Sequence, residues 1–362
     1  MSEDDLSEIR RQIDRLDQKL QALISERATL AQRVAEVKTK TGEKDGFYRP
    51  GREAEILRGV VERNDGPLSD DTVVRLFREI MSSCLALQHP LRVAYFGPAG
   101  TYTQAATFKH FGHGVNALPL PAIDDVFREV ASGSADYGVV PIENSTEGVV
   151  THTLDMFARS NLKICGEIVL PVHHCLLSCA NELASIDTVY SHSQSLGQCR
   201  RWLDTHLPNA QRESVSSNAE AARRVAELSD GGGAAVASRD AADVYGLKVL
   251  AENIEDEPDN TTRFLVIGRQ EVNATGDDKT SLMVSAANQP GALYAVLEPF
   301  ARHGVSLTRI ESRPSRRSRW DYNFFLDIEG HTEDAPVAAA LAEVKKKATV
   351  YKILGSYPTA IG

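Results

Sequence analysis

The stretch LSEIRRQIDRLDQKLQALISERATLAQRVAEVK, residues 6–38, decides how the first part of this chain folds. Read in alternating steps of three and four residues, it gives an aliphatic side chain at every position but one, where Arg27 stands. The aliphatic positions are Leu6, Ile9, Ile13, Leu16, Leu20, Leu23, Leu30, Val34 and Val37. Because no Gly or Pro occurs between Ser2 and Thr41, the pattern predicts one long helix with a packed apolar seam.

Arg27 is the exception that bears on function. A guanidinium keeps its proton, so a buried one needs an anionic partner, and the ordinary explanations are an internal ion pair or a side chain that reaches solvent. Lys38 lies within roughly 20° of Arg27 around the helix and about 16 Å along it, so the two cations can hold one small dianion. Arg10 is about 25 Å from Arg27 and rotated by roughly 100°, so it can contribute only from a second copy. Such a contribution predicts an intertwined dimer.

The length, net charge and composition of the chain exclude several classes of protein. The 362 residues are enough for about two to four domains. A net charge of −10 argues against a nucleic-acid partner. No apolar run is long enough to span a membrane, and the acidic start resembles no signal peptide, so we expect no membrane partner and a cytoplasmic location.

The five scattered cysteines indicate reduced thiols, and we expect no metal and no cofactor. His173-His174-Cys175 lies in an apolar run and indicates a packed strand rather than a metal site.

The chain changes character twice. Residues 1–89 are charged and helical in pattern, with a break at 42–51. Residues 91–270 repeat a strand, a turn of small residues and a helix, which predicts an α/β fold with a mostly parallel sheet. After a polar linker, residues 279–358 follow the order β-α-β-β-α-β, which is ferredoxin-like.

The three helices of the first segment together carry a recognisable set of polar residues. Arg52 and Glu53 open the second helix, while Cys84 and Gln88 share a face of the third. The set resembles the all-helical, intertwined chorismate mutase family. The resemblance implies substrate binding by Arg10 (from the partner chain), Arg27, Lys38, Arg52, Glu53 and Gln88. Arg49 and Cys84 occupy two further positions of this set, where the best-known member has aspartate and serine.

The chemistry of a mutase fits such a site. A pericyclic rearrangement needs no acid, base or nucleophile. It needs a flexible dianion held in a compact shape, with cations near the oxygen on which charge develops. Judged singly, Lys38 and Arg52 would be ordinary residues of a solvated helix face.

Three motifs mark the second segment. Gly97–Tyr102 (GPAGTY), Pro141–Ser145 (PIENS) and Asp259–Phe264 (DNTTRF) closely resemble prephenate dehydratase. That family implies two α/β subdomains like those of periplasmic binding proteins, with the active cleft between them. It also implies that Thr262 is catalytic. The implied substrate-binding residues are Thr101, Glu143, Asn144, Ser145, His192 and Arg263.

The turns that hold these residues have two interpretations. Strand-to-helix turns offer free N–H groups and a positive helix end to an anion, but Ser, Thr and Asn side chains there are usually helix caps. For Arg263, a structural ion pair with a carboxylate is as plausible as substrate binding. Prephenate loses CO2 and water as it becomes aromatic, and the difficult part is expelling hydroxide. A hydroxyl donor aimed at that oxygen lowers the barrier, and we expect Thr262 to act in this way.

The last segment resembles the ACT regulatory domain of prephenate dehydratases. The motifs are Asn288–Leu293 (NQPGAL) and Glu311–Pro314 (ESRP). The implied allosteric residues, which bind phenylalanine between paired copies, are Pro290, Gly291, Ala292, Leu293, Glu311, Ser312 and Arg313. The family also implies feedback inhibition. Arg316, Arg317 and Arg319 beside Trp320 indicate a solvated hairpin loop rather than a nucleic-acid patch.

These observations predict a multidomain, bifunctional enzyme of phenylalanine biosynthesis. It would convert chorismate to prephenate and prephenate to phenylpyruvate, sense phenylalanine, and form a homodimer or higher oligomer. A mutase fused to a prephenate dehydrogenase would need a dinucleotide motif, and no Gly-x-Gly-x-x-Gly follows a strand. A non-enzymatic amino-acid sensor would leave Arg27, Lys38 and Gln88 without a role. Dimer or tetramer, prephenate or arogenate, and direct transfer of prephenate between sites stay open.

Overall fold

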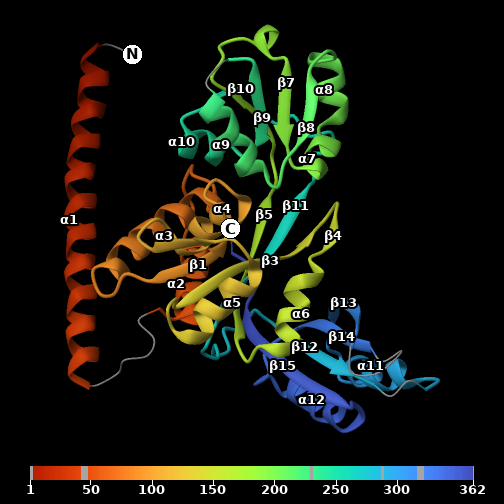
Figure 1. Cartoon of the computed structure of the whole chain (residues 1–362). Helices are drawn as coiled ribbons and strands as arrows, with labels where there is room; N and C mark the ends of the chain where they lie inside the picture. Colours follow the sequence, from red (N-terminus) through yellow and green to blue (C-terminus); the bar gives the residue numbers. More distant parts are fainter. Residues whose placement is uncertain (1–2, 42–47, 229–230, 287–288, 316–321, 362) are drawn as a thin grey trace.

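The protein is described by a computed structural model that covers residues 3–41, 48–228, 231–286, 289–315 and 322–361. Three parts follow one another along the chain (Figure 1). Most of the predicted break at 42–51 lies outside the described residues, as do Asn288, Arg316, Arg317, Arg319 and Trp320.

The first part consists of three helices. They are α1 (Glu3–Thr41), α2 (Pro50–Glu62) and α3 (Asp70–Ala86). Pro50 suits the first turn of α2, and the Ser69 side chain accepts a hydrogen bond from the N–H of Thr72 to cap α3. The prediction of one long N-terminal helix is confirmed. Its seam, however, is not packed by the same chain: Leu23 is 61% exposed and Leu6 41%, and α1 lies to one side of the molecule (Figure 1).

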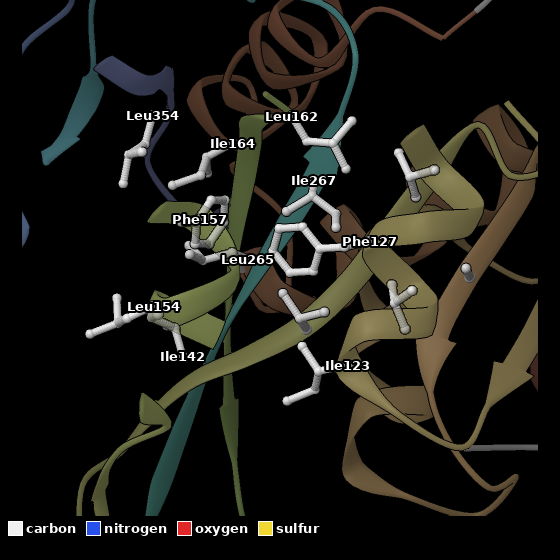
Figure 2. Packing of buried hydrophobic residues seen from close by; sticks show 14 of the residues in the cluster. Ile123, Phe127, Ile142, Leu154, Phe157, Leu162, Ile164, Leu265, Ile267 and Leu354 are labelled. Atoms are coloured by element: carbon white, nitrogen blue, oxygen red, sulfur yellow. The ribbon is translucent and has the colours of Figure 1, made fainter. Parts of the chain in front are cut away.

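The first lobe of the second part is a six-stranded sheet in the order β2-β1-β3-β11-β5, with β4 beside β3. Its strands are β1 (Arg92–Phe96), β2 (Asn116–Leu120), β3 (Tyr137–Asn144), β4 (Gly148–Val149), β5 (Lys163–Pro171) and β11 (Thr261–Gly268). Its helices are α4 (Tyr102–Phe111), α5 (Ile123–Ser132) and α6 (Thr151–Arg159). Phe127 and Phe157 meet edge to face at the centre of its core (Figure 2).

The second lobe is a five-stranded sheet in the order β10-β6-β9-β7-β8. Its strands are β6 (Cys175–Ser178), β7 (Thr188–Ser191), β8 (Gln211–Ser214), β9 (Gly233–Ala237) and β10 (Lys248–Ala251). Its helices are α7 (Ser193–Gln198), α8 (Arg200–His206), α9 (Asn218–Leu228) and α10 (Arg239–Tyr245), with a single turn at Leu183–Ser185. The chain enters this lobe after β5 and returns to the first lobe as β11.

Two details of the predicted α/β segment are wrong. The sheets are mixed rather than mostly parallel, since β11 runs antiparallel to both β3 and β5, and β6 antiparallel to β9 and β10. A chain that crosses to a second lobe and comes back inserts its returning strand in the opposite direction. For the same reason the predicted strand through His173-His174-Cys175 is interrupted at residues 172–174, where the chain passes between the lobes.

The third part has the predicted β-α-β-β-α-β order. Its elements are β12 (Asp278–Ser285), α11 (Ala292–Arg302), β13 (Leu307–Pro314), β14 (Tyr322–Glu329), α12 (Ala335–Lys347) and β15 (Val350–Pro358), with sheet order β13-β14-β12-β15. This module lies directly against the first lobe: a Cβ added to Gly355 would come within 2.2 Å of the Ile164 carbonyl oxygen. Leu354 joins the core of the first lobe (Figure 2).

None of the described helices is long and apolar enough to cross a membrane.

Candidate active sites

The first candidate site is a cavity of about 480 Å³ between the three N-terminal helices and the first lobe. Its polar lining consists mainly of predicted residues: Arg27, Lys38, Arg49, Arg52, Glu53, Cys84 and Gln88. Aliphatic side chains such as Leu30, Val34 and Ile56 form the rest of the wall. The structure therefore brings together every predicted mutase residue except Arg10, which does not line the cavity.

The electrostatics of this cavity suit a dianion. Four cations, from Arg27, Lys38, Arg49 and Arg52, line it together with one carboxylate, from Glu53. Within the described part of the chain, Arg27 makes no ion pair. Burial raises the pKa of Glu53 to about 7, while Arg78 and the Tyr48 hydroxyl oppose that rise.

The second candidate site centres on a hydrogen-bonded pair, Asn144 and Thr262, which lie opposite each other on β3 and β11. The Asn144 Oδ1 accepts hydrogen bonds from the N–H groups of Thr146 (3.0 Å) and Glu147 (2.9 Å). Its Nδ2 must therefore be the group that faces Thr262 Oγ1 (2.8 Å) and Asn260 Oδ1 (2.8 Å). Since Thr262 accepts from Asn144, its own hydroxyl proton remains available to donate elsewhere.

Side chains from the two lobes meet next to this pair. Glu147 accepts hydrogen bonds from Gln194 (2.7 Å) and Gln198 (3.2 Å) across the boundary between the lobes. Gln198 Oε1 in turn accepts from Asn260 Nδ2 (3.2 Å). Glu147, Gln194, Gln198 and Asn260 all line a cavity of about 490 Å³. A chain of hydrogen bonds thus connects Thr262 to this cleft.

His174 and Tyr102 are polar residues beside the cleft that sequence reasoning missed. His174 is 1% exposed, and its ring nitrogens contact the Tyr102 hydroxyl (2.8 Å) and Gln198 Oε1 (2.8 Å). Burial lowers the pKa of His174, which favours the neutral ring. The residue had been assigned to a packed strand, and only the crossing of the chain between lobes brings it here. Glu147 was also missed, although it lies only two residues after the Pro141–Ser145 motif.

Three predicted binding residues act as caps or loop anchors in this structure. Thr101 caps α4 by accepting from the N–H of Gln104 (3.4 Å). His192 Nδ1 caps the short α7 in the same way. Ser145 Oγ accepts from the N–H of Thr261 (2.9 Å). The turn that holds Ser145 leads into the β3–β4 hairpin, not directly into a helix as expected.

Arg263 and Glu143 do not face Thr262. Neighbouring residues of a strand point to opposite faces of the sheet, and these two lie on the face turned toward the regulatory module. Arg263 forms ion pairs with Glu167 (2.8 Å) and with Asp327 of β14 (2.6 Å). Glu143 accepts a hydrogen bond from Arg309 of β13 (2.9 Å). These contacts correct the expected cleft position of both residues and favour a structural pair for Arg263.

The regulatory motifs lie on the third part. Gly291 has a φ of +81°, a left-handed conformation that ends the loop before α11, with Pro290 before it and Ala292 and Leu293 after it. Glu311, Ser312 and Arg313 belong to β13, an edge strand, and Arg313 forms an ion pair with Asp155 of α6 (3.4 Å). Tyr294 (73% exposed) and Ile310 (44%) are large apolar side chains open to solvent beside these motifs.

Known families match each part of the chain. Residues 9–89 match the model of chorismate mutase type II, residues 93–272 that of prephenate dehydratase, and residues 280–346 that of the ACT domain. A relative from Pseudomonas aeruginosa, named bifunctional chorismate mutase/prephenate dehydratase, is 54% identical over 363 residues, covering 99% of both chains.

Solved structures match the second and third parts. Prephenate dehydratase from Arthrobacter aurescens in complex with L-Phe is 38% identical with a TM-score of 0.69, covering 74% of this chain and 90% of that one. A protein described as a quorum quenching acylase, GqqA, has the same TM-score of 0.69 at 32% identity, covering 74% of this chain and 98% of its own.

Proposed function

Because this chain belongs to the bifunctional chorismate mutase/prephenate dehydratase family, we propose that its two cavities carry out successive steps of phenylalanine biosynthesis. The first converts chorismate to prephenate, and the second converts prephenate to phenylpyruvate. We assign the mutase to residues 1–89, the dehydratase to 91–270 and the regulatory domain to 279–358. The observation that carries the proposal is the cation-lined cavity between helices, on the same chain as the Asn144–Thr262 pair.

In the mutase site the proposed work is positioning. Arg27, Lys38 and Arg52 hold the carboxylates and the ether oxygen of chorismate, and Gln88 donates to that oxygen as the C–O bond breaks. Glu53 accepts a hydrogen bond from the substrate hydroxyl. Arg49 adds positive charge where the best-known mutase has aspartate.

Arg10 completes the site from a second copy, which requires a dimer. The exposed seam of α1 supports this assembly, since each of its aliphatic side chains is about half exposed in the single chain. Covering one such side chain stabilises by roughly 1 kcal/mol, and the seam repeats over the length of a 39-residue helix. Pairing of two seams therefore supplies on the order of 10 kcal/mol per chain.

In the dehydratase site Thr262 donates a hydrogen bond to the departing hydroxyl of prephenate. Asn144 holds the Thr262 oxygen, so the proton is directed away from the amide. As the ring becomes aromatic, the C–O bond breaks, CO2 leaves, and the donor stabilises the negative charge on the leaving oxygen. Gln198 and Asn260 line the cleft next to this pair and extend its polar surface.

The third part binds phenylalanine between two paired copies, at the loop of Gly291 and the edge strand of Arg313. The exposed Tyr294 and Ile310 suit an aromatic amino acid and a partner module. Inhibition then follows through the contacts of this module with the first lobe.

One assay tests the whole proposal. Purified protein receives chorismate, and phenylpyruvate is followed by its absorbance with and without phenylalanine. We expect phenylpyruvate to form without any cofactor and to form more slowly with phenylalanine. Loss of chorismate with accumulation of prephenate would exclude the dehydratase, and binding of phenylalanine without turnover would favour a non-enzymatic sensor. Arogenate, supplied in parallel with prephenate, shows which substrate the second site prefers.

A further inference from the structure

Residues 359–361, which follow the last strand of the regulatory module, reach the mutase helices. The Thr359 N–H bonds to the Asp277 carbonyl (3.1 Å), and the Ile361 side chain packs against Leu57 and Val74. These apolar residues belong to α2 and α3. The end of the regulatory module is therefore part of the packing that holds the two mutase helices together.

Arg78 of α3 connects this segment to the mutase site. It is 8% exposed, its Nη2 donates to the Ile361 carbonyl (3.1 Å), and its Nε lies 3.7 Å from Oε1 of Glu53. That Nε has no hydrogen-bond acceptor among the residues that the structure describes. The distance to Glu53 is too long for a hydrogen bond, but such contacts often tighten only when substrate is bound.

Glu53 lies between two cavities. In front is the 480 Å³ mutase cavity, and behind is a small one of about 40 Å³ lined by Arg78 and by residues 358–361. The charged and titratable groups of the rear side are Tyr48, Arg78, Lys109, His110, Cys165 and Glu167.

Among these rear groups, only Arg78 offers its charge to Glu53. Lys109 donates to the Val169 carbonyl (2.9 Å), and Glu167 is paired with Arg263 and Lys279. Burial lowers the pKa of His110 to about 3, so its ring is neutral at pH 7. Burial likewise raises the pKa values of the Tyr48 hydroxyl and the Cys165 thiol, which are therefore uncharged.

We propose that Arg78 is a positioning residue of the mutase site, that it orients the Glu53 carboxylate and keeps it ionised, and that the Ile361 carbonyl holds Arg78 in place. The end of the regulatory module thereby completes the mutase site of its own chain. This inference rests on the proposed mutase function of Glu53, which accepts the substrate hydroxyl best as a carboxylate.

The test is the pH profile of mutase kcat/KM in Arg78→Gln, with Arg75→Gln as the matched control. Arg75 is exposed and lies one turn earlier on α3. In the wild type, kcat/KM rises with pH as Glu53 ionises. Loss of Arg78 moves the midpoint of this rise upward by at least about one pH unit, so kcat/KM at pH 7 falls at least about fivefold and recovers at higher pH. Arg78→Lys keeps the charge and moves the midpoint less. Dehydratase kcat/KM stays unchanged and shows that each variant is folded.

A second arm tests the role of Ile361. A variant that stops after Pro358 shifts the mutase profile in the same direction as Arg78→Gln, and the same truncation in the Arg78→Gln background adds nothing, because both changes break one connection. Additive effects would overturn the role of Ile361. A profile of Arg78→Gln that matches Arg75→Gln, or equal loss of both activities, would overturn the role of Arg78. If the wild type itself does not consume chorismate, the proposed mutase function fails instead.

Discussion

Replacing Thr262 with valine tests the proposed chemistry of the dehydratase most directly. Valine keeps the shape of threonine and exchanges the hydroxyl for a methyl group. Asn144 loses one acceptor of its Nδ2 and keeps two others, Asn260 Oδ1 at 2.8 Å and the Thr261 carbonyl at 3.4 Å. The substrate loses the only donor that this pair can direct at its leaving hydroxyl.

The expected loss is large for activity and small for stability. A preorganised donor aimed at developing negative charge contributes about 10²–10³-fold to kcat, or about 2.7–4 kcal/mol. The remaining Asn144–Asn260 bond keeps the amide satisfied, so unfolding free energy should fall by roughly 1 kcal/mol. Thr262→Ser retains the donor and should keep kcat within about tenfold of the wild type.

The assay is the formation of phenylpyruvate from prephenate, with chorismate consumption measured on the same preparation. Thr261→Val is the matched control, because its side chain points to the other face of β11. We expect Thr261→Val to keep normal dehydratase turnover and both variants to keep normal mutase turnover. A Thr262→Val enzyme that retains more than about a tenth of wild-type kcat would refute the role of Thr262 as the donor.

Four further outcomes follow from the structure. Arg27→Ala should lower mutase kcat/KM by at least about 10² and leave dehydratase turnover largely intact; equal loss of both would identify Arg27 as structural. Gly291→Val should weaken phenylalanine inhibition before catalysis, because φ +81° costs a branched residue about 1–2 kcal/mol; an unchanged inhibition curve would contradict the regulatory assignment. Asp327→Asn should lower the unfolding free energy by roughly 3 kcal/mol in denaturant melts, since Arg263 and Lys279 are then left with the single carboxylate of Glu167. Asp277→Asn, at an exposed carboxylate, is its control. Glu53 binds its proton more tightly when folded, so between pH 4.5 and about 7 its ionisation costs stability as pH rises; relative to Glu53→Gln, the wild type should lose roughly 3 kcal/mol over that window, and a flat difference would contradict the shift.

The grouping of the predicted mutase residues around one cavity could be read from the sequence, because helix geometry converts spacing into position. Arg27 and Lys38 line one cavity, as their eleven-residue separation requires, and Arg10 lies outside it. The order of elements in the regulatory domain was also readable, since each strand and helix there has its own local pattern. These are properties of short stretches of chain, and short stretches are what hydrophobic periodicity describes.

The directions of β11 and β6 could not be read in the same way. Whether a strand runs parallel to its neighbour depends on where the chain goes between them, and here it goes to another lobe and back. Because the chain crosses to the second lobe, His174 lies beside Tyr102, which is 72 residues away in the sequence. The opposite orientation of Thr262 and Arg263 does follow from strand geometry, but only the folded structure shows which face of β11 adjoins the cleft.

The two faces of the β3–β11 strand pair make different contacts. Toward the cleft, Asn144 holds Thr262, and on the other face Glu143 and Arg263 hold Arg309 and Asp327 of the regulatory module. Asn144 and Thr262 are therefore each covalently adjacent to a residue that is ion-paired with the module. A ligand of the module alters catalysis only if it binds one arrangement of these contacts more tightly than another. Allosteric coupling is typically about 1–3 kcal/mol, and breaking a buried ion pair such as Arg263–Asp327 costs about 3–5 kcal/mol, so rearrangement of that one pair would supply a coupling of the usual size.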